Sequence, residues 1–332
     1  MGTIIITGAN GSLAIPAVEQ LLSQCPDHTL VLTVRNTASE DPNTQKLRDV
    51  ISHYHTAKTS IRQLDLASLS SVHKLAGDIA TEITEGKLPQ LTSIVCNAYY
   101  WNLVTEAQLT EDGYEKTFQV NHLAHSVLAL RLLGHFGPEG GRIVLFSSDT
   151  HFPGQSPLEK YPPVIPDDLD LLVKPPNYEK VDHMGRGFQN YSVSKLAITM
   201  WMYAINRHLE KDEDLKKITV VAINPGNLTD SRALQVNTPT QVKVMSSFII
   251  RPFSFLLRRF MDPTMRSAGE AAADIVGLAT SKINPGEGGY FTLSRKDKSS
   301  TDSYNEEVQE KLWKKTLEWG GINGENSALK NI

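Results

Sequence analysis

A tyrosine and a lysine four positions apart could carry out proton transfer in this chain of 332 residues. Tyr191 and Lys195 belong to the segment Tyr-Ser-Val-Ser-Lys. In a helix, residues four apart lie on the same face. A lysine ammonium beside a phenol stabilises the phenolate and lowers the phenol pKa from about 10 towards neutral pH. The pair therefore predicts a general acid for the reduction of a carbonyl group.

The same spacing occurs at Tyr54 and Lys58, so the pair needs support from the elements around it. Short apolar runs alternate with segments of helical periodicity. We predict strands at 4–7, 29–34, 61–65, 91–97, 142–147, 218–223 and 289–292, and helices at 13–22, 69–83, 114–133, 191–209 and 270–280. Tyr54 and Lys58 precede the third strand, away from the carboxyl edge where such sheets bind ligands, and we interpret them as an exposed pair.

This alternation predicts the α/β class, with a doubly wound, Rossmann-like parallel sheet covered by helices on both faces. No change in composition indicates a second domain, so we expect a single domain over 1–332. Within it we assign 1–150 mainly to cofactor binding, 151–190 to a proline-rich insertion, 238–265 to a substrate-lid segment and 303–320 to a C-terminal helix.

Composition excludes several classes of function. The net charge of −4 lacks the excess of positive charge that is typical of nucleic-acid-binding proteins. No apolar run reaches the roughly 18 residues that span a bilayer, and a strand-like segment begins at once, so we expect no signal peptide and a cytoplasmic protein. The two cysteines, Cys25 and Cys96, do not indicate a disulfide framework. His122 and His125 lack a third ligand, so we expect no metal.

The end of the first predicted strand is a candidate phosphate site. Thr7 and Gly8 lead into a helix that begins near Leu13. The backbone N–H groups of a helix N-terminus bind phosphate, and glycine allows close approach. The alternative is a plain turn between a strand and a helix.

The ends of the next two strands suggest which dinucleotide binds. Arg35 follows the second strand, where an acidic residue usually binds the ribose of NAD, and a guanidinium suits the 2′-phosphate of NADP. We therefore expect NADP(H) rather than NAD(H), although Arg35 could be an ordinary surface arginine. Asp65 closes the third strand and could either bind the adenine or cap the next helix.

Taken in order, these segments resemble the short-chain dehydrogenase/reductase family over nearly the whole chain. The matching residues are Thr7-Gly8, Asp65-Leu66, Asn97-Ala98, Asn121, Ser147-Ser148, Tyr191 with Lys195, and Pro225-Gly226. The apolar stretch after Thr238, the strand at 289–291 and the Leu312-Trp313 tail resemble the branch of retinol dehydrogenase-like proteins and fungal reductases.

The resemblance implies a catalytic tetrad. Tyr191 would donate the proton, and Lys195 would hold the cofactor ribose and lower the tyrosine pKa. Ser148 would orient the substrate oxygen, and Asn121 would bind a water that connects Lys195 to solvent. For cofactor binding the resemblance implies Gly8, Asn10, Ser12, Leu13, Arg35, Asp65, Leu66, Asn97, Ala98, Tyr191, Lys195, Pro225, Gly226 and Thr229. It also implies a small, fairly apolar carbonyl or alcohol substrate and a homo-oligomer.

Several positions depart from the family pattern. Ser12 and Ala14 replace glycines of the phosphate loop, Tyr99 replaces the glycine after Asn97-Ala98, and Asp230 replaces a threonine. The changed loop keeps open a second interpretation, in which a non-redox protein uses the same scaffold as an isomerase, a cyclase or a nucleotide sensor.

Two segments are candidates for substrate contact. We expect the 151–190 insertion to fold over the pocket, where His151, Tyr161, Tyr178 and Phe188 would contact substrate or pack within the loop. The aromatic and basic stretch at 248–260 could be a substrate lid, an oligomer contact or a membrane-surface patch, in that order of preference.

Overall fold

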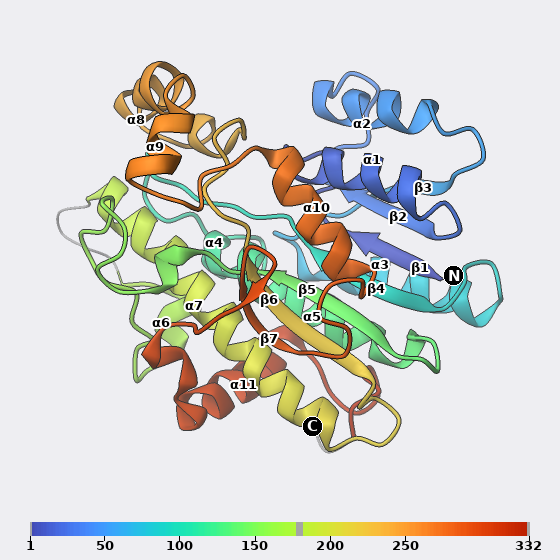
Figure 1. The fold of residues 1–332 in the computed structure, drawn as a ribbon. Coiled ribbons are helices and arrows are strands. Elements are labelled where there is room, and N and C mark those ends of the chain that lie inside the picture. The colour runs from blue at the N-terminus through green and yellow to red at the C-terminus, as the bar shows by residue number, and fades with distance from the viewer. Residues whose placement is uncertain (1, 177–181, 331–332) are drawn as a thin grey trace.

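The computed structural model describes residues 2–176 and 182–330, and one eight-stranded sheet forms its centre (Figure 1). Its order is β3-β2-β1-β4-β5-β6-β7-β8. All neighbouring strands are parallel except β7 and β8. The strands are β1 Thr3–Ile6, β2 Thr29–Val34, β3 Lys58–Gln63, β4 Leu91–Cys96, β5 Gly141–Phe146, β6 Ile218–Asn224, β7 Gly289–Thr292 and β8 Arg295–Lys296. The predicted doubly wound α/β fold is confirmed.

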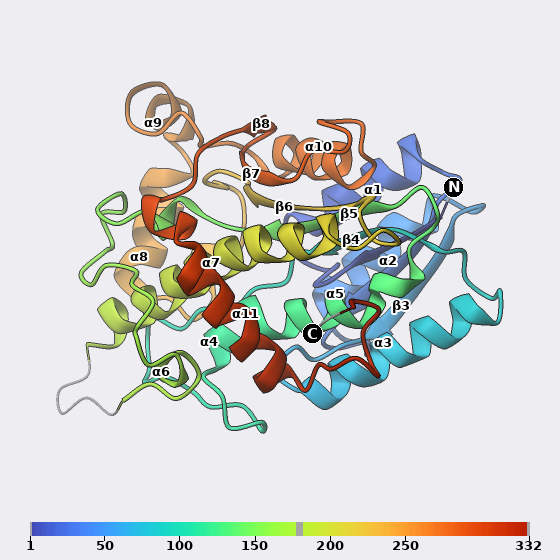
Figure 2. The same cartoon turned by 90° about the horizontal axis from the view of Figure 1, so that it is seen from below.

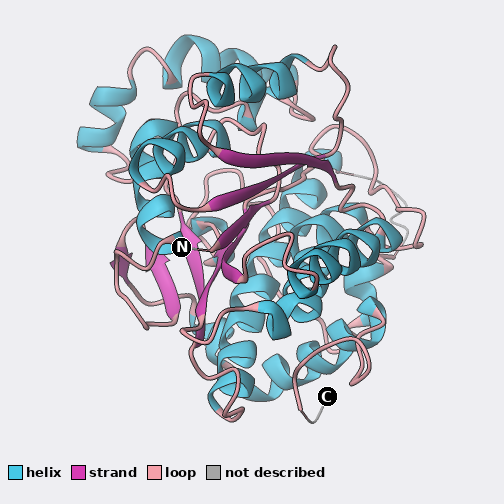
Figure 3. Cartoon of the chain, turned by 90° about the vertical axis from the view of Figure 1, so that its right-hand side faces the viewer, coloured by secondary structure: helices cyan, strands magenta, loops and turns pink. Residues whose placement is uncertain are grey.

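Helices cover both faces of the sheet. On one face lie α3 Leu69–Thr84, α5 Ala124–Leu132, α7 His183–Glu210 and α11 Glu306–Gly320, as Figure 2 shows. On the other lie α1 Ala14–Gln24, α2 Pro42–Ser52 and α10 Ala268–Ala279. Figure 3 shows the strands passing between the two layers of helices. Successive side chains of a strand enter opposite cores, which explains why β1 and β2 are buried throughout and mostly apolar.

Element boundaries differ from the prediction where tertiary contacts decide them. The helix predicted at 114–133 consists of α4 Lys116–Phe118, a π-helical turn Gln119–Leu123 and α5. Helix α7 starts at His183, so the end of the 151–190 insertion is helical, and α6 Asp170–Val173 is a further short helix within it. Helix α2 escaped prediction because it is largely polar and buries only Thr44 and Leu47.

The C-terminal third adds helices around the sheet. The 238–265 segment contains α8 Thr240–Met245, a π-helical turn Ser246–Ile250 and α9 Ser254–Phe260, which stand away from the sheet in Figure 1. The predicted C-terminal helix is α11, whose Trp313 stacks on Trp201 of α7. None of the described helices has the length and apolar character that crossing a bilayer requires.

One buried arginine fixes the loop that leads into β7. Arg142 of β5 is fully buried, and its Nε donates to the Thr219 hydroxyl of β6 at 3.2 Å. Its two terminal nitrogens donate to the carbonyl oxygens of Ile283, Asn284 and Glu287 at 2.8, 2.5 and 3.2 Å. Three of these four hydrogen bonds go to loop carbonyl groups and replace the water that the loop backbone would otherwise need.

We expect Arg142→Met to lower the free energy of unfolding by about 3 kcal/mol, because it leaves buried carbonyl groups without donors. Urea unfolding followed by circular dichroism measures this. Arg295→Met is the control, since Arg295 is exposed on β8, and its effect should stay within about 0.5 kcal/mol. Equal stability of the two variants would contradict the role given to Arg142.

Candidate active site

The predicted acid/base pair lies on α7, next to the carboxyl end of β5. The Lys195 ammonium is buried and donates to the carbonyl oxygen of Phe146, the last residue of β5, at 2.8 Å. Its Nζ lies 5.4 Å from the centre of the Tyr191 ring. The helical spacing thus brings both side chains to the edge of the sheet where this fold binds its ligands.

The electrostatics of this pair differ from the expectation. Burial raises the pKa of Tyr191, electrostatic interactions with Tyr99 and Asp149 raise it further, and a hydrogen bond with Ser148 opposes the rise. Burial also lowers the pKa of Lys195 to about 7. The expectation that Lys195 depresses the pKa of Tyr191 is therefore wrong for this structure, because desolvation of both groups outweighs their attraction.

Ser148 lies directly after β5, where its backbone is held by a histidine. Its hydroxyl donates to Asp149 Oδ1 at 2.9 Å and accepts from the Thr150 backbone at 3.3 Å. The fully buried His151 bonds through Nδ1 to the Ser148 carbonyl, and its Nε2 accepts from the Ser300 backbone at 3.1 Å. Burial lowers the pKa of His151 to about 4. His151 therefore positions Ser148, and the interpretation as a substrate contact is wrong.

Asn121 lies in the π-helical turn and joins two segments of the site. Its side-chain oxygen accepts from the Tyr100 backbone at 2.7 Å. Its nitrogen donates to the Tyr100 carbonyl at 2.9 Å and to the Ser194 hydroxyl at 3.0 Å. Ser194 in turn donates to the Tyr191 carbonyl at 2.6 Å. Asn121 thus positions the helical turn that carries Tyr191, and its predicted water-binding role stays a prediction.

Apolar side chains surround the Tyr191 ring. Trp101 lies 5.5 Å from it between ring centres, and Tyr99 lies 6.3 Å from it. The insertion adds Leu158 and Phe188 to this cluster. Phe188 therefore stays a candidate substrate contact.

Two further candidates from the insertion have different outcomes. Tyr161 packs under the Arg186 guanidinium, 3.8 Å from its ring centre, which agrees with packing inside the loop. Tyr178 lies outside the described residues.

The loop after β1 has the backbone geometry of a phosphate-binding turn. Gly8 adopts a left-handed φ of 61°, and a Cβ there would lie 2.9 Å from the Ala98 side chain. Asn97 donates to the carbonyls of Thr7 and Gly8 at 2.9 and 3.1 Å. The predicted residues Gly8, Asn97 and Ala98 therefore meet at one place, and Asn97 acts there by holding the loop.

The two histidines considered as metal ligands have structural partners instead. His125 Nε2 pairs with the Thr7 hydroxyl at 2.9 Å, and His122 Nε2 pairs with the Thr316 hydroxyl of α11 at 2.9 Å. Burial lowers the pKa of both histidines to about 3. Each therefore stays neutral and links secondary-structure elements.

The residues predicted to bind the adenosine half lie around the ends of β2 and β3. Arg35 is exposed, and its positive charge opposes the rise in pKa that burial causes at Tyr100. Asp65 accepts from the Ala67 backbone at 2.9 Å, while Ser68 caps α3, so Asp65 stabilises the turn before that helix. Asn10 donates to the Thr44 hydroxyl of α2 at 2.9 Å.

Leu13 and Leu66 are core residues, so only their backbones could reach a cofactor.

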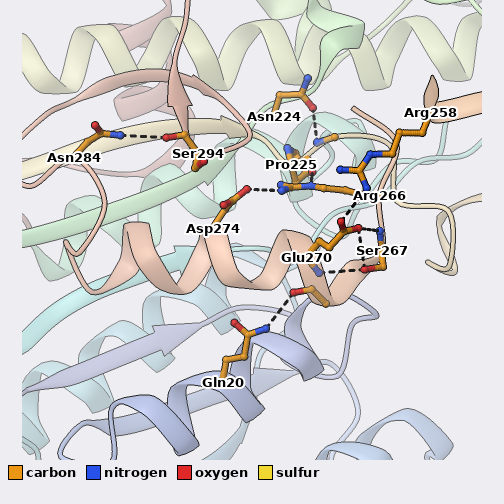
Figure 4. A network of polar contacts seen from close by, with 12 residues as sticks. Gln20, Asn224, Pro225, Arg258, Arg266, Ser267, Glu270, Asp274, Asn284 and Ser294 are labelled. Atoms are coloured by element: carbon orange, nitrogen blue, oxygen red, sulfur yellow. Dashed lines mark hydrogen bonds and ion pairs between the residues drawn. The ribbon is translucent and has the colours of Figure 1, made fainter. Parts of the chain in front are cut away.

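The turn at Pro225 and Gly226 is anchored by an arginine that the sequence did not single out (Figure 4). Arg266 is nearly buried, donates to the Pro225 carbonyl at 2.7 Å and pairs with Asp274 of α10. Its carbonyl accepts from the Thr229 backbone at 3.1 Å. Gly226 has a φ of 82°, and a Cβ there would lie 2.3 Å from the Thr264 carbonyl oxygen. Arg266 thus holds Pro225 and Thr229, while Gly226 packs against the Thr264 carbonyl.

A second arginine outside the prediction reaches the phosphate loop. Arg232 donates to the Asn10 carbonyl at 2.7 Å and to the Ser12 hydroxyl at 3.2 Å. Ser12, the residue that departs from the glycine pattern, is therefore a hydrogen-bonding partner. Nothing in local sequence signals this contact, because the residues lie 220 positions apart.

The aromatic side chains of the 248–260 stretch point outward. Phe248, Phe255 and Phe260 are 72%, 79% and 77% exposed. These three therefore form no wall of the Tyr191 cluster in this conformation, and the lid assignment stays a prediction.

The site fits a nicotinamide dinucleotide. The Gly8 turn leaves no room for a Cβ, the loop precedes helix α1, and Arg232 donates to the Asn10 carbonyl of the loop. Positive charge and free backbone N–H groups at such a turn match the phosphates of a dinucleotide. Tyr191 and Lys195 lie beyond the loop along the same edge of the sheet.

Family models match two parts of the chain. One described as AcuH dehydrogenase domain matches residues 232–329, and one described as male sterility protein matches residues 6–84. The short-chain dehydrogenase iccH of Talaromyces variabilis is 27% identical over 377 residues, which cover 99% of this chain and 98% of that protein. The dehydrogenase acuH of Aspergillus aculeatus is 42% identical over 94 residues, which cover 28% of this chain and 95% of that protein.

A solved structure shows the same fold. The NADPH-bound carbonyl reductase from chicken fatty liver superposes with a TM-score of 0.59 at 16% sequence identity, covering 90% of this chain and 99% of that chain.

The depressed pKa of Lys195 predicts a pH-dependent stability. The unfolded chain binds a proton at this lysine up to about pH 10.4, while the folded protein loses it near pH 7, so stability rises with pH between these values. Between pH 7 and 9, we expect the free energy of unfolding of the wild type to rise by about 2 kcal/mol more than that of Lys195→Met. Urea unfolding at both pH values measures the difference, with the exposed Lys58→Met as the control. Parallel pH curves for the wild type and Lys195→Met would show that the ammonium is not desolvated.

Proposed function

We propose that this chain, which belongs to the short-chain dehydrogenase/reductase family of oxidoreductases, uses NADPH to reduce the carbonyl group of a small, fairly apolar molecule. The observation that carries this proposal is the position of the buried Lys195 beside the half-buried Tyr191, at the carboxyl edge of the sheet. The cofactor, when bound, supplies a hydride to the carbonyl carbon.

Tyr191 is suited to give up a proton. Because burial raises its pKa, the hydroxyl stays protonated at neutral pH and can donate to the substrate oxygen. The Ser148 hydroxyl, which interacts with the Tyr191 hydroxyl, can orient the same oxygen by exchanging its hydrogen bond to Asp149 for one to the substrate. Reduction of a carbonyl needs a proton donor, so a Tyr191 that is protonated before substrate binds supports reduction as the direction of the reaction.

Lys195 balances the charge that appears when Tyr191 loses its proton. Its pKa of about 7 means that a modest change in surroundings decides its charge. The Tyr191 ring centre lies 5.4 Å from the Lys195 Nζ, and a phenolate at Tyr191 favours the charged ammonium form of the lysine. Lys195 would then take up a proton from solvent as Tyr191 gives its own proton to the substrate oxygen, which keeps the net charge of the pair close to constant.

The surroundings of the hydroxyl support an apolar substrate. Trp101, Leu103 and Phe188 are buried beside Tyr191, and Leu158 and Leu234 complete the cluster. Such a lining excludes water and strengthens the interactions of the transferred proton.

Two observations support NADPH as the cofactor. Arg35 is exposed at the end of β2, and the structurally similar chicken carbonyl reductase binds NADPH. The assignments of a homo-oligomer and a cytoplasmic location stay predictions from sequence.

We expect Tyr191→Phe to lower NADPH-dependent turnover of a panel of ketones and aldehydes by about 10²- to 10⁴-fold, because it removes the proton donor and keeps the ring. NADPH oxidation at 340 nm measures turnover, and fluorescence titration checks that the variant still binds NADPH. Tyr54→Phe, at the duplicate motif, should retain full activity. Full turnover in Tyr191→Phe would rule out the mechanism. Nucleotide binding without turnover of any carbonyl by the wild type would favour the non-redox alternative.

Arg35→Ala tests the choice of dinucleotide. Removing a charge-assisted contact to the 2′-phosphate should weaken NADPH binding by about 10- to 100-fold and leave NADH binding unchanged. Isothermal titration with both cofactors provides the dissociation constants. Arg295→Ala, on the exposed strand β8, is the matched control. Equal weakening of NADPH and NADH in Arg35→Ala would remove Arg35 from the 2′-phosphate site.

A further inference from the structure

Arg232 joins two parts of the site that are distant in sequence. It follows the Pro225–Gly226 turn and precedes a 3-10 turn at Ala233–Gln235. One terminal nitrogen donates to the Asn10 carbonyl at 2.7 Å, and Nε donates to the Ser12 hydroxyl at 3.2 Å. The Arg232 backbone N–H also donates to that hydroxyl, at 3.1 Å. Ser12 therefore accepts two hydrogen bonds from one residue and fixes where the guanidinium lies.

The charge of Arg232 is not balanced by the protein. In the part of the chain that the structure describes, no carboxylate forms an ion pair with this half-buried guanidinium, whereas Arg266 pairs with Asp274 and Arg258 with Glu270. The contacts of Arg232 are neutral oxygens. The N-terminus of α1, at Ala14, lies two residues after Ser12 and adds the positive end of a helix dipole. Two positive features thus converge at one loop.

Arg232 also lies close to the residues around Tyr191. Its positive charge opposes the rise to about 12 that burial causes in the pKa of Tyr99. The Tyr99 ring lies 6.3 Å from the Tyr191 ring. The guanidinium is therefore situated between the phosphate loop and the residues that surround the proton donor.

We propose that Arg232, held by Ser12, is a binding site for the diphosphate group of the dinucleotide. This inference rests on the proposed function and deepens it. A planar guanidinium beside a loop of backbone N–H groups can bind two phosphate oxygens at once. The serine that departs from the glycine pattern acts as the anchor of this arginine, and the arginine supplies charge that a glycine loop alone lacks.

The arrangement assigns a second role to the segment that carries Arg232. This segment leads into α8 and α9, so a diphosphate bound by Arg232 contacts both the first loop of the chain and the residues that precede the 238–265 segment. Arg251 reinforces the connection by donating to the Ser231 carbonyl at 2.9 Å. Cofactor binding would thereby hold the start of this segment in place before substrate arrives.

The test compares dissociation constants, measured by isothermal titration, for NADPH, NADH and adenosine 2′-monophosphate. Arg232→Ala should weaken NADPH and NADH alike by about 10- to 100-fold, since both carry the diphosphate. Adenosine 2′-monophosphate has no 5′-phosphate, so its binding should not change. Arg35→Ala is the matched control. It should weaken the binding of NADPH and of adenosine 2′-monophosphate, and it should leave the binding of NADH unchanged.

Two milder variants keep the test decisive if Arg232→Ala folds poorly. Arg232→Lys keeps the charge but loses the planar fork, and should weaken NADPH binding less than the alanine variant does. Ser12→Gly restores the family residue and frees the guanidinium, and should weaken NADPH binding by about 3- to 10-fold.

The outcomes separate this inference from the proposed function. Unchanged binding of NADPH in Arg232→Ala and Ser12→Gly overturns the diphosphate site and leaves the reductase intact. Weaker binding of all three ligands to the same extent assigns Arg232 a purely structural role and also overturns the site. A wild-type protein that binds neither dinucleotide overturns the proposed function itself.

Discussion

The desolvation of one lysine is the constraint on which the rest of the site depends. Lys195 is buried with the Phe146 carbonyl as its hydrogen-bond partner, and in the described chain no carboxylate pairs with it. An unpaired buried ammonium is costly, and another positive charge beside it would raise that cost further. His125 interacts with Lys195, whose charge lowers the pKa of this histidine beyond the effect of burial. Burial also holds the pKa of His122 and His151 far below neutrality, so none of the three histidines adds a positive charge. The polar groups around the lysine thus act as hydrogen-bonding links.

The sequence predicted the sheet and the central pair for a simple physical reason. Strands covered on both faces are continuous apolar runs, and residues four apart on a helix share a face. The carboxyl edge then had to gather Gly8, Asn97, Ser148 and Tyr191. The pKa of Tyr191 was predicted in the wrong direction, because the cost of burial depends on how the whole chain encloses the ring, and no local pattern records it.

What local reasoning missed is held by contacts between distant segments. Arg266 and Arg232 have their partners in α10 and in the first loop, so their roles appear only once the chain is folded. The π-helical turn at Asn121 also makes contacts with distant segments that local sequence does not reveal. Its extra residue lets the amide reach Tyr100 and Ser194, and helical periodicity in the sequence cannot reveal it.

The bond between Ser12 and Arg232 makes two remote positions depend on each other. A serine in a glycine loop looks like a defect when the loop is inspected alone, yet here it is half of a contact whose other half lies in the last third of the chain. Exchanging the N-terminal half with that of a relative that has glycine at this position would separate the two residues. Chimeras and ancestral reconstructions of this protein therefore have to treat positions 12 and 232 as one inherited character.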